Sequence, residues 1–303
     1  MYDIVIVGAG PAGLTAALYA RRAEKSVLVI EKMTFGGQIT HSPRVENYPG
    51  FKVMSGTEFA DKLVEQVLEQ GAEIELDTVT GIDGTPGEYK VVCEGATYDA
   101  KSVIIATGSH HRMLGLPKET DFTGEGVQYC AVCDGAFYRD KSVAVVGGGN
   151  TALQEAIMLS DICADVTIVQ NLDFLTGETK LQNDIKEKGN IKVILSSTVD
   201  AILGDTEFKG IRINTNGELS DLFVDGVFVA IGQVPENEPF RDVTTLNEYG
   251  YIVAGETCVP EGAKEGIFVA GDCRTKTIRQ VTTASADGAI AALSACRFVD
   301  SIK

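Results

Sequence analysis

The stretch DIVIVGAGPAGLTAALYARRAEKSVLVIE, residues 3–31, decides the fold of this chain. The apolar run DIVIV suits a buried strand of a parallel sheet, and KSVLVI predicts a second strand after an alanine- and leucine-rich helix. The intervening turn has the GxGxxG pattern, formed by Gly8, Gly10 and Gly13, which lets the backbone approach a pyrophosphate. Glu31 ends the second strand, where dinucleotide folds place a ribose-binding carboxylate, so the stretch predicts a dinucleotide-binding unit rather than a tight turn alone.

A second unit of the same plan runs through KSVAVVGGGNTALQEAIMLSDICADVTIVQ, residues 141–170. Its turn has the accepted variant GxGxxA, formed by Gly147, Gly149 and Ala152. The two units together predict an α/β chain with two Rossmann-like domains. A fold of this type does not by itself establish which ligand it binds.

The end of the second unit lacks the side chains that recognise a nicotinamide dinucleotide. NAD binding favours an acid where this chain has Gln170, and NADP binding favours arginines, which residues 171–176 do not contain. Without arginines a ribose phosphate loses a bidentate, charge-assisted contact, and Asp173 and Glu178 would repel it. The helix N-terminus still offers weak anion binding, so a working NAD(P)H site stays open as the less favoured hypothesis.

The segment QYCAVCDGAFY, residues 128–138, contains a CxxC pair, Cys130 and Cys133, followed by Asp134. Such a pair serves as half of a zinc site, as a structural disulfide or as a redox dithiol. Zinc would need further ligands, and the chain has three histidines and no other CxxC, so we predict no metal site. Thiol exchange needs a thiolate and a proton partner, and Asp134 is placed to be that partner. We therefore predict a catalytic redox pair.

The segment FGGQITHSPRVENYPGF, residues 35–51, follows the first unit. Its Gly36 and Gly37 permit close backbone approach, and the amides of Gln38 and Asn47 can pair with the polar edge of a ring. An ordinary surface loop explains these residues equally well, so the segment alone does not decide its own function.

Length and composition restrict the class of protein. The chain has 303 residues, enough for about two domains, and its net charge of −17 disfavours binding to nucleic acid and to anionic membranes. No apolar run approaches the ~20 residues of a membrane span, and the start MYDIVIVGAG lacks the features of a signal peptide. We expect a cytoplasmic protein in a reducing compartment. Cys93 and Cys163 are interpreted as small buried side chains and Cys258 and Cys296 as structural, with the role of Cys273 left open.

These motifs, in this order, resemble the low-molecular-weight thioredoxin reductases. The resemblance covers essentially the whole chain through GAGPAGLTAALYA, GGQ, VENYPGF, CAVCDG, GGGNTA, VFVAIG and GDCRTKTIRQ. It implies an FAD-binding domain formed by residues 1–114 and 244–303, with a second dinucleotide-type domain, residues 115–243, inserted and carrying the CxxC. It also implies a homodimer whose substrate is thioredoxin.

The resemblance assigns roles to individual residues. It implies that Cys133 faces the flavin, that Cys130 attacks the thioredoxin disulfide and that Asp134 gives and takes the proton. The residues that it implies for FAD binding are Gly8, Gly10, Gly13, Glu31, Gly37, Gln38, Asn47, Gly271, Asp272, Arg279 and Gln280.

The chain departs from the NADPH-dependent members of this family at one place. Those enzymes have an HRRxxFR-like pattern after the second strand, whereas residues 170–175 are QNLDFL, without a basic residue. Such a loss resembles the ferredoxin-dependent flavin thioredoxin reductases of clostridia, which do not use NAD(P)H, and CRTKTIRQ resembles that subgroup too. We therefore expect a flavoenzyme that reduces thioredoxin with electrons from ferredoxin. The alternatives are an NAD(P)H-dependent thioredoxin reductase with altered cofactor contacts and, in another class, a flavin redox sensor without turnover.

Two further expectations concern access for partners. Since ferredoxins are usually acidic, docking on this acidic chain needs a local positive face, for which the candidates are Arg21, Arg22, Lys25, Arg274, Lys276 and Arg279. Because flavin and thioredoxin must reach the same sulfurs, we expect the inserted domain to swing about connections near residues 112–117 and 240–246.

Overall fold

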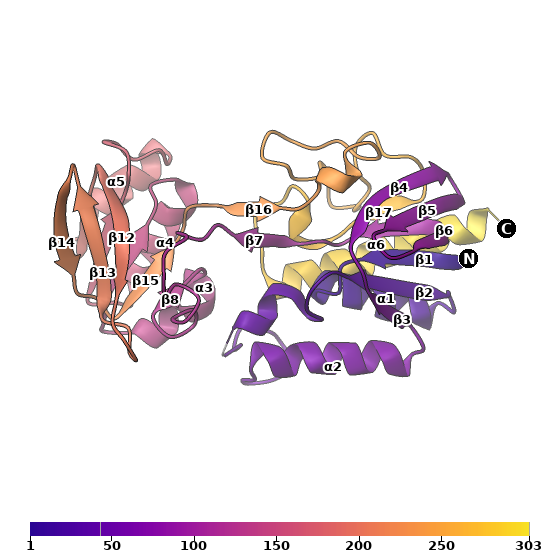
Figure 1. Ribbon diagram of the computed structural model, residues 1–303, viewed down its shortest axis with the longest axis horizontal. Helices are drawn as coiled ribbons and strands as arrows, with labels where there is room; N and C mark the ends of the chain where they lie inside the picture. The colour runs from indigo at the N-terminus through magenta and orange to yellow at the C-terminus, as the bar shows by residue number, and fades with distance from the viewer. Residues whose placement is uncertain (43, 303) are drawn as a thin grey trace. The chain divides into compact units, whose positions relative to one another are not determined.

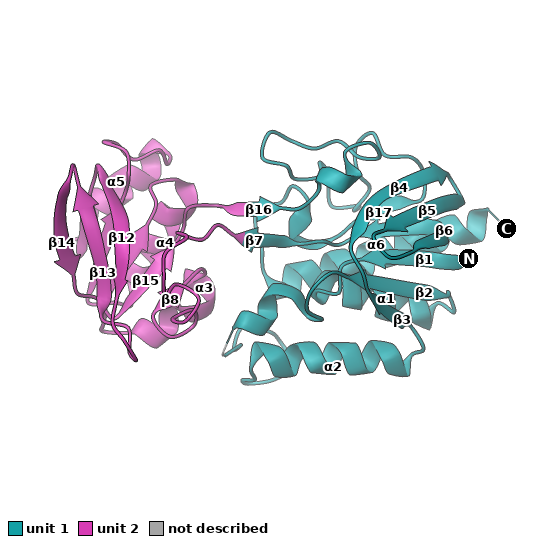
Figure 2. Ribbon diagram, viewed as in Figure 1, with its two compact units in different colours: residues 1–110, 234–303 teal, residues 111–233 magenta. Residues whose placement is uncertain are grey.

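The chain divides into two units, each built around its own parallel sheet. A computed structural model describes residues 1–42 and 44–302. Unit 1 comprises residues 1–110 and 234–303, and unit 2, residues 111–233, is inserted between these two parts (Figure 2). The predicted α/β class with two Rossmann-like domains, the second inserted in the first, is confirmed.

Unit 1 contains a seven-stranded sheet. Its strands are β1 (Tyr2–Val7), β2 (Val27–Glu31), β3 (Glu73–Leu76), β4 (Val79–Thr85), β5 (Glu88–Cys93), β6 (Thr97–Ile105) and β17 (Ile267–Val269). The order is β3-β2-β1-β6-β5-β4, and β17 pairs with the C-terminal part of β6 (Figure 1). The pairs that involve β5 are antiparallel, whereas β3, β2, β1, β6 and β17 run parallel, so the carboxyl ends of β1 and β2 lie at one edge.

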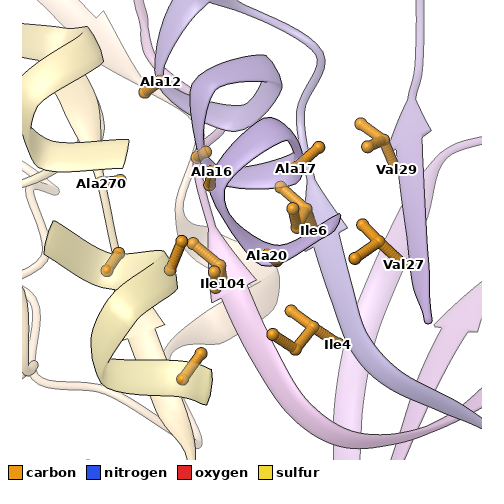
Figure 3. Close-up of a cluster of buried hydrophobic side chains, with 14 of the residues drawn as sticks. Ile4, Ile6, Ala12, Ala16, Ala17, Ala20, Val27, Val29, Ile104 and Ala270 are labelled. Carbon is orange, nitrogen blue, oxygen red and sulfur yellow. The ribbon is translucent and has the colours of Figure 1, made fainter. Parts of the chain in front are cut away.

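Three helices cover one face of this sheet: α1 (Pro11–Arg22), α2 (Gly56–Glu69) and α6 (Val281–Ser301). Because side chains alternate along a strand, Ile4 and Ile6 of β1 point to this face, where they pack with the alanines of α1 (Figure 3). Val5 and Val7 point to the opposite face and join a second buried cluster. Neither α6, the longest helix, nor any other helix in the described part of the chain has the length and hydrophobicity that crossing a membrane requires.

Helices α1 and α6 pack at short range through small residues. A Cβ atom on Gly288 of α6 would lie 2.1 Å from the carbonyl oxygen of Ala12 in α1. A Cβ on Gly271, which precedes α6, would lie 2.9 Å from Ala12 Cβ. The chain segments before the two helices are therefore held together at the same edge of the sheet.

Unit 2 has three layers. Its parallel sheet has the strands β8 (Val127–Gln128), β9 (Ser142–Val146), β10 (Asp165–Val169), β11 (Ile191–Ile194) and β15 (Gly226–Val229), in the order β11-β10-β9-β15-β8. One face packs on the helices α3 (Ala131–Asp134), α4 (Asn150–Ser160) and α5 (Thr179–Glu187). The other face packs on an antiparallel sheet of β12 (Ser197–Leu203), β13 (Gly210–Thr215) and β14 (Glu218–Leu222).

Two short strands, β7 (Ser109–His111) and β16 (Gln233–Pro235), form the connections between the units and pair with each other. The chain crosses from unit 1 to unit 2 after residue 110 and returns after residue 233. Residues 111–114, expected in the FAD domain, therefore belong to unit 2.

Residues 234–243, which the family resemblance placed in the inserted domain, belong to unit 1. Hydrogen bonds and burial explain this difference. Asn237 donates to the carbonyls of Gly250 at 2.9 Å and Cys273 at 2.8 Å, and Phe240 of the short helix η3 is buried in the core of unit 1. The helix η3 spans Glu238–Phe240.

Candidate active site

Glycines without room for side chains shape the turn after β1. Gly8 has a φ angle of +108°, and a Cβ atom there would lie 2.4 Å from Ala106 O. A Cβ on Gly13 would lie 1.9 Å from Gly8 O, so α1 approaches its own strand closely. Glu31, at the end of β2, accepts a hydrogen bond from the Ala9 N–H at 2.8 Å. The structure thus brings two of the predicted glycines and the predicted carboxylate together at one turn.

A second pair of glycines lies against this turn. Gly36 donates its N–H to Ala9 O at 2.8 Å, and a Cβ on Gly37 would lie 3.2 Å from Gly10 Cα. Both residues have positive φ angles, 102° and 65°. Two backbone segments are therefore adjacent with no side chains between them, which is the kind of surface that a pyrophosphate requires.

The second predicted FAD motif, Gly271 and Asp272, lies in the helix η4 (Gly271–Cys273) beside the first turn of α1. Asp272 Oδ1 is buried and has no hydrogen-bond partner among the described residues. Lys276 Nζ is 3.9 Å from this oxygen, too far for a hydrogen bond. Burial raises the pKa of the Asp272 carboxyl. Because an unsatisfied buried oxygen is costly, this site fits a ligand with hydroxyl donors, and the ribityl chain of FAD has them.

The residues predicted near the flavin ring meet at the start of α6. Asn47 Nδ2 donates to Gln280 Oε1 at 3.1 Å, although 233 positions separate the two residues. The Arg279 guanidinium lies 4.3 Å from the ring centroid of Tyr251. Gln38 is exposed, and within residues 1–42 and 44–302 its side chain has no hydrogen bond to these residues. Sequence reasoning missed Tyr251, because no local pattern connects it with Arg279.

Three cations proposed for a positive docking face are buried in ion pairs, so this part of the prediction is wrong. Arg274 contacts the carboxylate of Asp287 through two hydrogen bonds of 2.9 and 2.8 Å, and Lys276 Nζ lies 2.9 Å from the same carboxylate. Lys25 donates to Asp300 at 2.6 Å. A cation removed from water needs such a partner. These side chains are therefore paired in the interior of unit 1 and do not contribute to a positive surface.

The other three docking candidates differ among themselves. Arg21 donates to the carbonyls of Gln70 and Lys25, and Arg279 lies over the Tyr251 ring. Arg22 is exposed.

In unit 2, Cys130 and Cys133 form a disulfide around the start of α3. The Cys133 N–H donates to Cys130 Sγ at 3.2 Å. Val132, between the two cysteines, exposes 57% of its surface, so a partner can reach the backbone of this motif. The other five cysteines are buried and outside disulfides, which confirms the prediction of buried side chains for Cys93 and Cys163.

Asp134 follows the disulfide and is 8% exposed. Burial raises the pKa of this carboxyl to about 6. Its Oδ1 atom is buried without a hydrogen-bond partner in the described residues. A carboxyl whose pKa lies close to neutrality exchanges protons readily under physiological conditions, which is the property that thiol chemistry needs.

A second carboxyl, Glu155 of α4, contacts the backbone of the same motif and was missed by sequence reasoning. Its Oε1 accepts a hydrogen bond of 3.4 Å from the N–H of Ala131, which is inside the CxxC. Burial and the nearby charge of Asp134 raise the pKa of Glu155 to about 7. One sequence signal was available, since Glu155 interrupts the apolar face of α4 between Ala152 and Leu159.

The second glycine turn, after β9, is in contact with the residue that replaces the expected acid. Gln170 is buried, and its Cδ atom lies 2.4 Å from the point that a Cβ on Gly148 would occupy. The amide of Gln170 donates to Phe174 O at 3.2 Å. The side chain therefore lies against the turn instead of presenting a carboxylate to a ribose.

The segment after Gln170 is tied to the same turn. The N–H groups of Thr176 and Gly177 both donate to Gly148 O, at 2.8 and 2.9 Å. At the first residue of α4, the Asn150 side chain accepts from the Glu178 N–H at 2.7 Å and donates to Glu178 Oε1 at 3.1 Å. A carboxylate therefore lies at the helix N-terminus where dinucleotide folds bind phosphate.

The fold and these sites define the class of protein: a flavoprotein oxidoreductase with a nucleotide-type glycine turn in each unit and a CxxC disulfide in unit 2. The chain belongs to the pyridine nucleotide-disulphide oxidoreductase family, whose model matches residues 2–288. The predicted cofactor, FAD, agrees with membership of this family and with the orphaned oxygen of Asp272.

Similar proteins cover almost the whole chain. A thioredoxin reductase of Bacillus subtilis (strain 168) is 41% identical over 308 residues, which cover 100% of this chain and 96% of the relative. A protein described as "34.2 kDa protein in rubredoxin operon" of Clostridium pasteurianum is 41% identical over 300 residues, which cover 98% and 97%. The crystal structure of thioredoxin reductase from Streptococcus pyogenes MGAS5005 has a TM-score of 0.94 at 39% identity and covers 99% of each chain. The predicted resemblance to thioredoxin reductases is confirmed.

Proposed function

We propose that the protein reduces the disulfide of thioredoxin with electrons from reduced ferredoxin, through FAD and the Cys130–Cys133 pair. Relatives named thioredoxin reductase, similar over the whole chain, support thioredoxin as the substrate. The disulfide with an exposed residue at its centre supports a macromolecular disulfide as the partner.

One observation carries the choice of donor: the second glycine turn is covered by its own chain. Gln170 lies against Gly148, and Glu178 lies at the N-terminus of α4. A nicotinamide dinucleotide would have to displace the first and tolerate the negative charge of the second, without an arginine in residues 170–176 to compensate. A donor that delivers electrons without occupying this turn fits these residues better, and ferredoxin is such a donor.

Bound FAD would be held by the glycines of the first turn, Glu31 and Asp272, and it supplies the electron pair. The disulfide takes two electrons and two protons, its S–S bond breaks, and Cys130 and Cys133 become thiols. The thiolate of Cys130 attacks a sulfur of thioredoxin to form a mixed disulfide. Cys133 then attacks Cys130, the intramolecular disulfide forms again, and reduced thioredoxin leaves. Asp134, buried beside the pair, holds the exchanged proton.

The same two sulfurs must meet FAD and thioredoxin in turn. We therefore propose that the units move relative to each other about β7 and β16, where the chain crosses between them. We also propose that the protein acts as a homodimer, as the family resemblance implies.

The donor is tested by anaerobic turnover of the FAD-loaded enzyme with oxidised thioredoxin. Ferredoxin is reduced with dithionite and freed of excess reductant by gel filtration, and NADPH and NADH are used in parallel reactions. New thioredoxin thiols are counted with a chromogenic disulfide. We expect thiols with ferredoxin and none above background with either nucleotide.

Two outcomes would contradict the proposal. Turnover with NADPH or NADH at the rate seen with ferredoxin would identify a pyridine-nucleotide enzyme. Flavin reduction by ferredoxin without any thioredoxin thiols would instead point to a redox sensor. A Cys130→Ser variant is the control, since it keeps the flavin site but cannot complete the exchange.

A further inference from the structure

Two buried carboxyl groups lie next to the redox disulfide, although one proton-exchanging group is usually assigned to thiol exchange. Asp134 ends α3, and Glu155 projects from α4 to the Ala131 N–H inside the CxxC motif. Asp134 Oδ1 and Glu155 Oε2 are both buried, and neither has a hydrogen-bond partner in residues 1–42 and 44–302. An oxygen in this situation is stabilised by carrying a proton, because the charged form loses its hydration.

Reduction and reoxidation of the disulfide each transfer two protons, so two proton-carrying groups would serve the reaction better than one. Reduction of the disulfide consumes two electrons and two protons, and oxidation of the dithiol by a partner disulfide returns both protons to the partner's sulfurs. A single carboxyl holds one proton at a time. Asp134 alone would therefore have to be reprotonated from solvent between the two sulfur displacements, and its exposed fraction is 8%.

We propose that Glu155 is a second proton-holding residue of the redox centre, acting through Asp134 and the CxxC backbone. Each of the two carboxyls gives a proton to a sulfur as the disulfide is reduced, and each carboxylate then passes a thiol proton to a sulfur of the partner disulfide as the dithiol is reoxidised. This inference rests on the proposed disulfide reduction and not on the identity of the electron donor. Glu155 is a positioning and proton-holding residue, because it accepts its hydrogen bond from a backbone N–H and not from a thiol.

The electrostatic surroundings agree with shared protons. Burial raises the pKa of Asp134 to about 6, and burial together with the charge of Asp134 raises the pKa of Glu155 to about 7. The remaining ionisable neighbour of Asp134 is Tyr138 in the helix η2 (Gly135–Tyr138), whose hydroxyl accepts from the Gln128 amide and whose pKa is raised by burial. Within the described residues no salt bridge joins a cation to either carboxyl, so nothing offsets the burial that favours the neutral form of each.

Infrared difference spectroscopy on the FAD-loaded enzyme tests this inference directly. Spectra of the dithionite-reduced minus the oxidised enzyme are recorded in H2O and D2O, and protonated carboxyl groups are identified by the isotope shift of their C=O band. We expect two such bands in the unmodified protein, one of which is missing in Glu155→Gln and the other in Asp134→Asn. The control is Glu187→Gln, which removes an exposed carboxyl from α5.

A Glu155→Asp variant guards against misfolding as an explanation. It keeps a carboxyl on α4, so we expect its band to persist at a shifted position. A Glu155→Gln spectrum that retains both bands, in a protein with unchanged circular dichroism, would overturn the inference. This measurement needs neither ferredoxin nor thioredoxin, so its failure is distinct from the failure of the proposed function.

The pH dependence of the sulfur chemistry gives a second readout. The pre-reduced enzyme is mixed with oxidised thioredoxin, and the rate of thiol transfer is measured as a function of pH. Loss of Glu155 leaves the lower pKa of Asp134 to define the alkaline limb, so we expect that limb to begin about one pH unit lower in Glu155→Gln. The rate would then be about tenfold slower than in the unmodified protein above about pH 8 and unchanged near about pH 5. A uniform loss at all pH values would indicate a structural role and contradict proton storage.

Discussion

Gln170 and Gly148 are in direct contact: the amide carbon of Gln170 lies 2.4 Å from the point that a Cβ atom on Gly148 would occupy. In a dinucleotide fold this turn normally approaches the cofactor. Here it approaches a buried glutamine that is anchored by a hydrogen bond to Phe174 O. The contact explains what fills the turn in a chain that has Gln170 in place of an acid and no arginine in residues 170–176.

This contact predicts unequal effects of two neighbouring substitutions. Gly148→Ala displaces the Gln170 side chain and breaks its hydrogen bond, so we expect a loss of about 1–2 kcal/mol in the free energy of unfolding. Gly149→Ala is the matched control, because its Cβ would meet Thr176 Oγ1 at 3.8 Å, an ordinary contact. Urea denaturation of both variants checks this, and equal destabilisation would show that Gln170 does not fill the turn.

The buried ion cluster around Asp287 predicts that loss of this carboxylate strongly lowers the stability of unit 1. Asp287→Asn removes the countercharge of Arg274 and the nearer of the two carboxylates around Lys276, so we expect a loss of about 3–5 kcal/mol in unfolding free energy. Asp221→Asn, which breaks an exposed pair with Arg212, is expected to cost far less, because solvent screens the two charges. Comparable losses in the two variants would refute the role of the cluster.

The same cluster predicts how stability depends on pH. Burial opposes ionisation of Asp287, but hydrogen bonds and charge from Arg274 and Lys276 hold its pKa below the usual value of 3.8. An acid with a depressed pKa in the folded state stabilises the fold above its unfolded pKa, and this contribution is lost as the pH falls through the folded value. We expect the difference in unfolding free energy between the unmodified protein and Asp287→Asn to shrink below about pH 4. Thermal unfolding at several pH values checks it.

The ionisation of Asp134 has the opposite effect on how stability depends on pH. Its pKa is raised from 3.8 to about 6 by burial, so the folded state binds its proton more tightly and the stability that this provides is lost as the pH rises between these values. Asp134→Asn should therefore raise the thermal midpoint at pH 8 relative to the unmodified protein more than at pH 4. The same variant should slow thioredoxin reduction by about 100-fold or more, because a general acid–base group is lost. A variant with normal turnover would exclude Asp134 from proton transfer.

The unpartnered oxygen of Asp272 leads us to expect that this residue contributes to the affinity for FAD. Its unpartnered oxygen is available to a hydroxyl donor, and a hydrogen bond to a charged group contributes about 1.5–3 kcal/mol. We expect Asp272→Ala to weaken FAD binding by about ten- to 100-fold, measured from the quenching of flavin fluorescence during titration of apoprotein. Asp242→Ala removes an exposed carboxyl from the same unit and should leave the affinity unchanged. Equal affinities in the two variants would remove Asp272 from the cofactor site.

Much of this protein could be predicted from motifs whose residues lie close together in the chain. The turn around Gly8, Gly10 and Gly13 depends on glycines a few positions apart, because only such residues permit its positive φ angle and its close backbone approach. The same holds for the Cys130–Cys133 pair, whose spacing places both sulfurs at one end of a short helix. Residue types at short spacing determine these features almost without reference to the rest of the fold.

Other features depend on which elements pack together, and the sequence could not supply them. Arg274 and Lys276 looked like surface charges, yet the packing of η4 against α6 surrounds them with Asp287 and buries them. Glu155 was not singled out from the sequence, because its place beside the CxxC motif depends on how α3 packs on α4. A charged side chain has opposite consequences in water and in the interior, and its position relative to distant segments decides between them.

The amino-acid sequence by itself determined the two glycine turns, the CxxC pair and the absence of arginines in residues 170–176, because each is a property of neighbouring residues. The tertiary structure alone decided that Gln170 covers the second turn, that Asn47 meets Gln280, and that two carboxyls lie beside one disulfide. These last relationships join residues from different strands, helices and loops. They exist only once burial of the apolar faces has fixed how those elements pack.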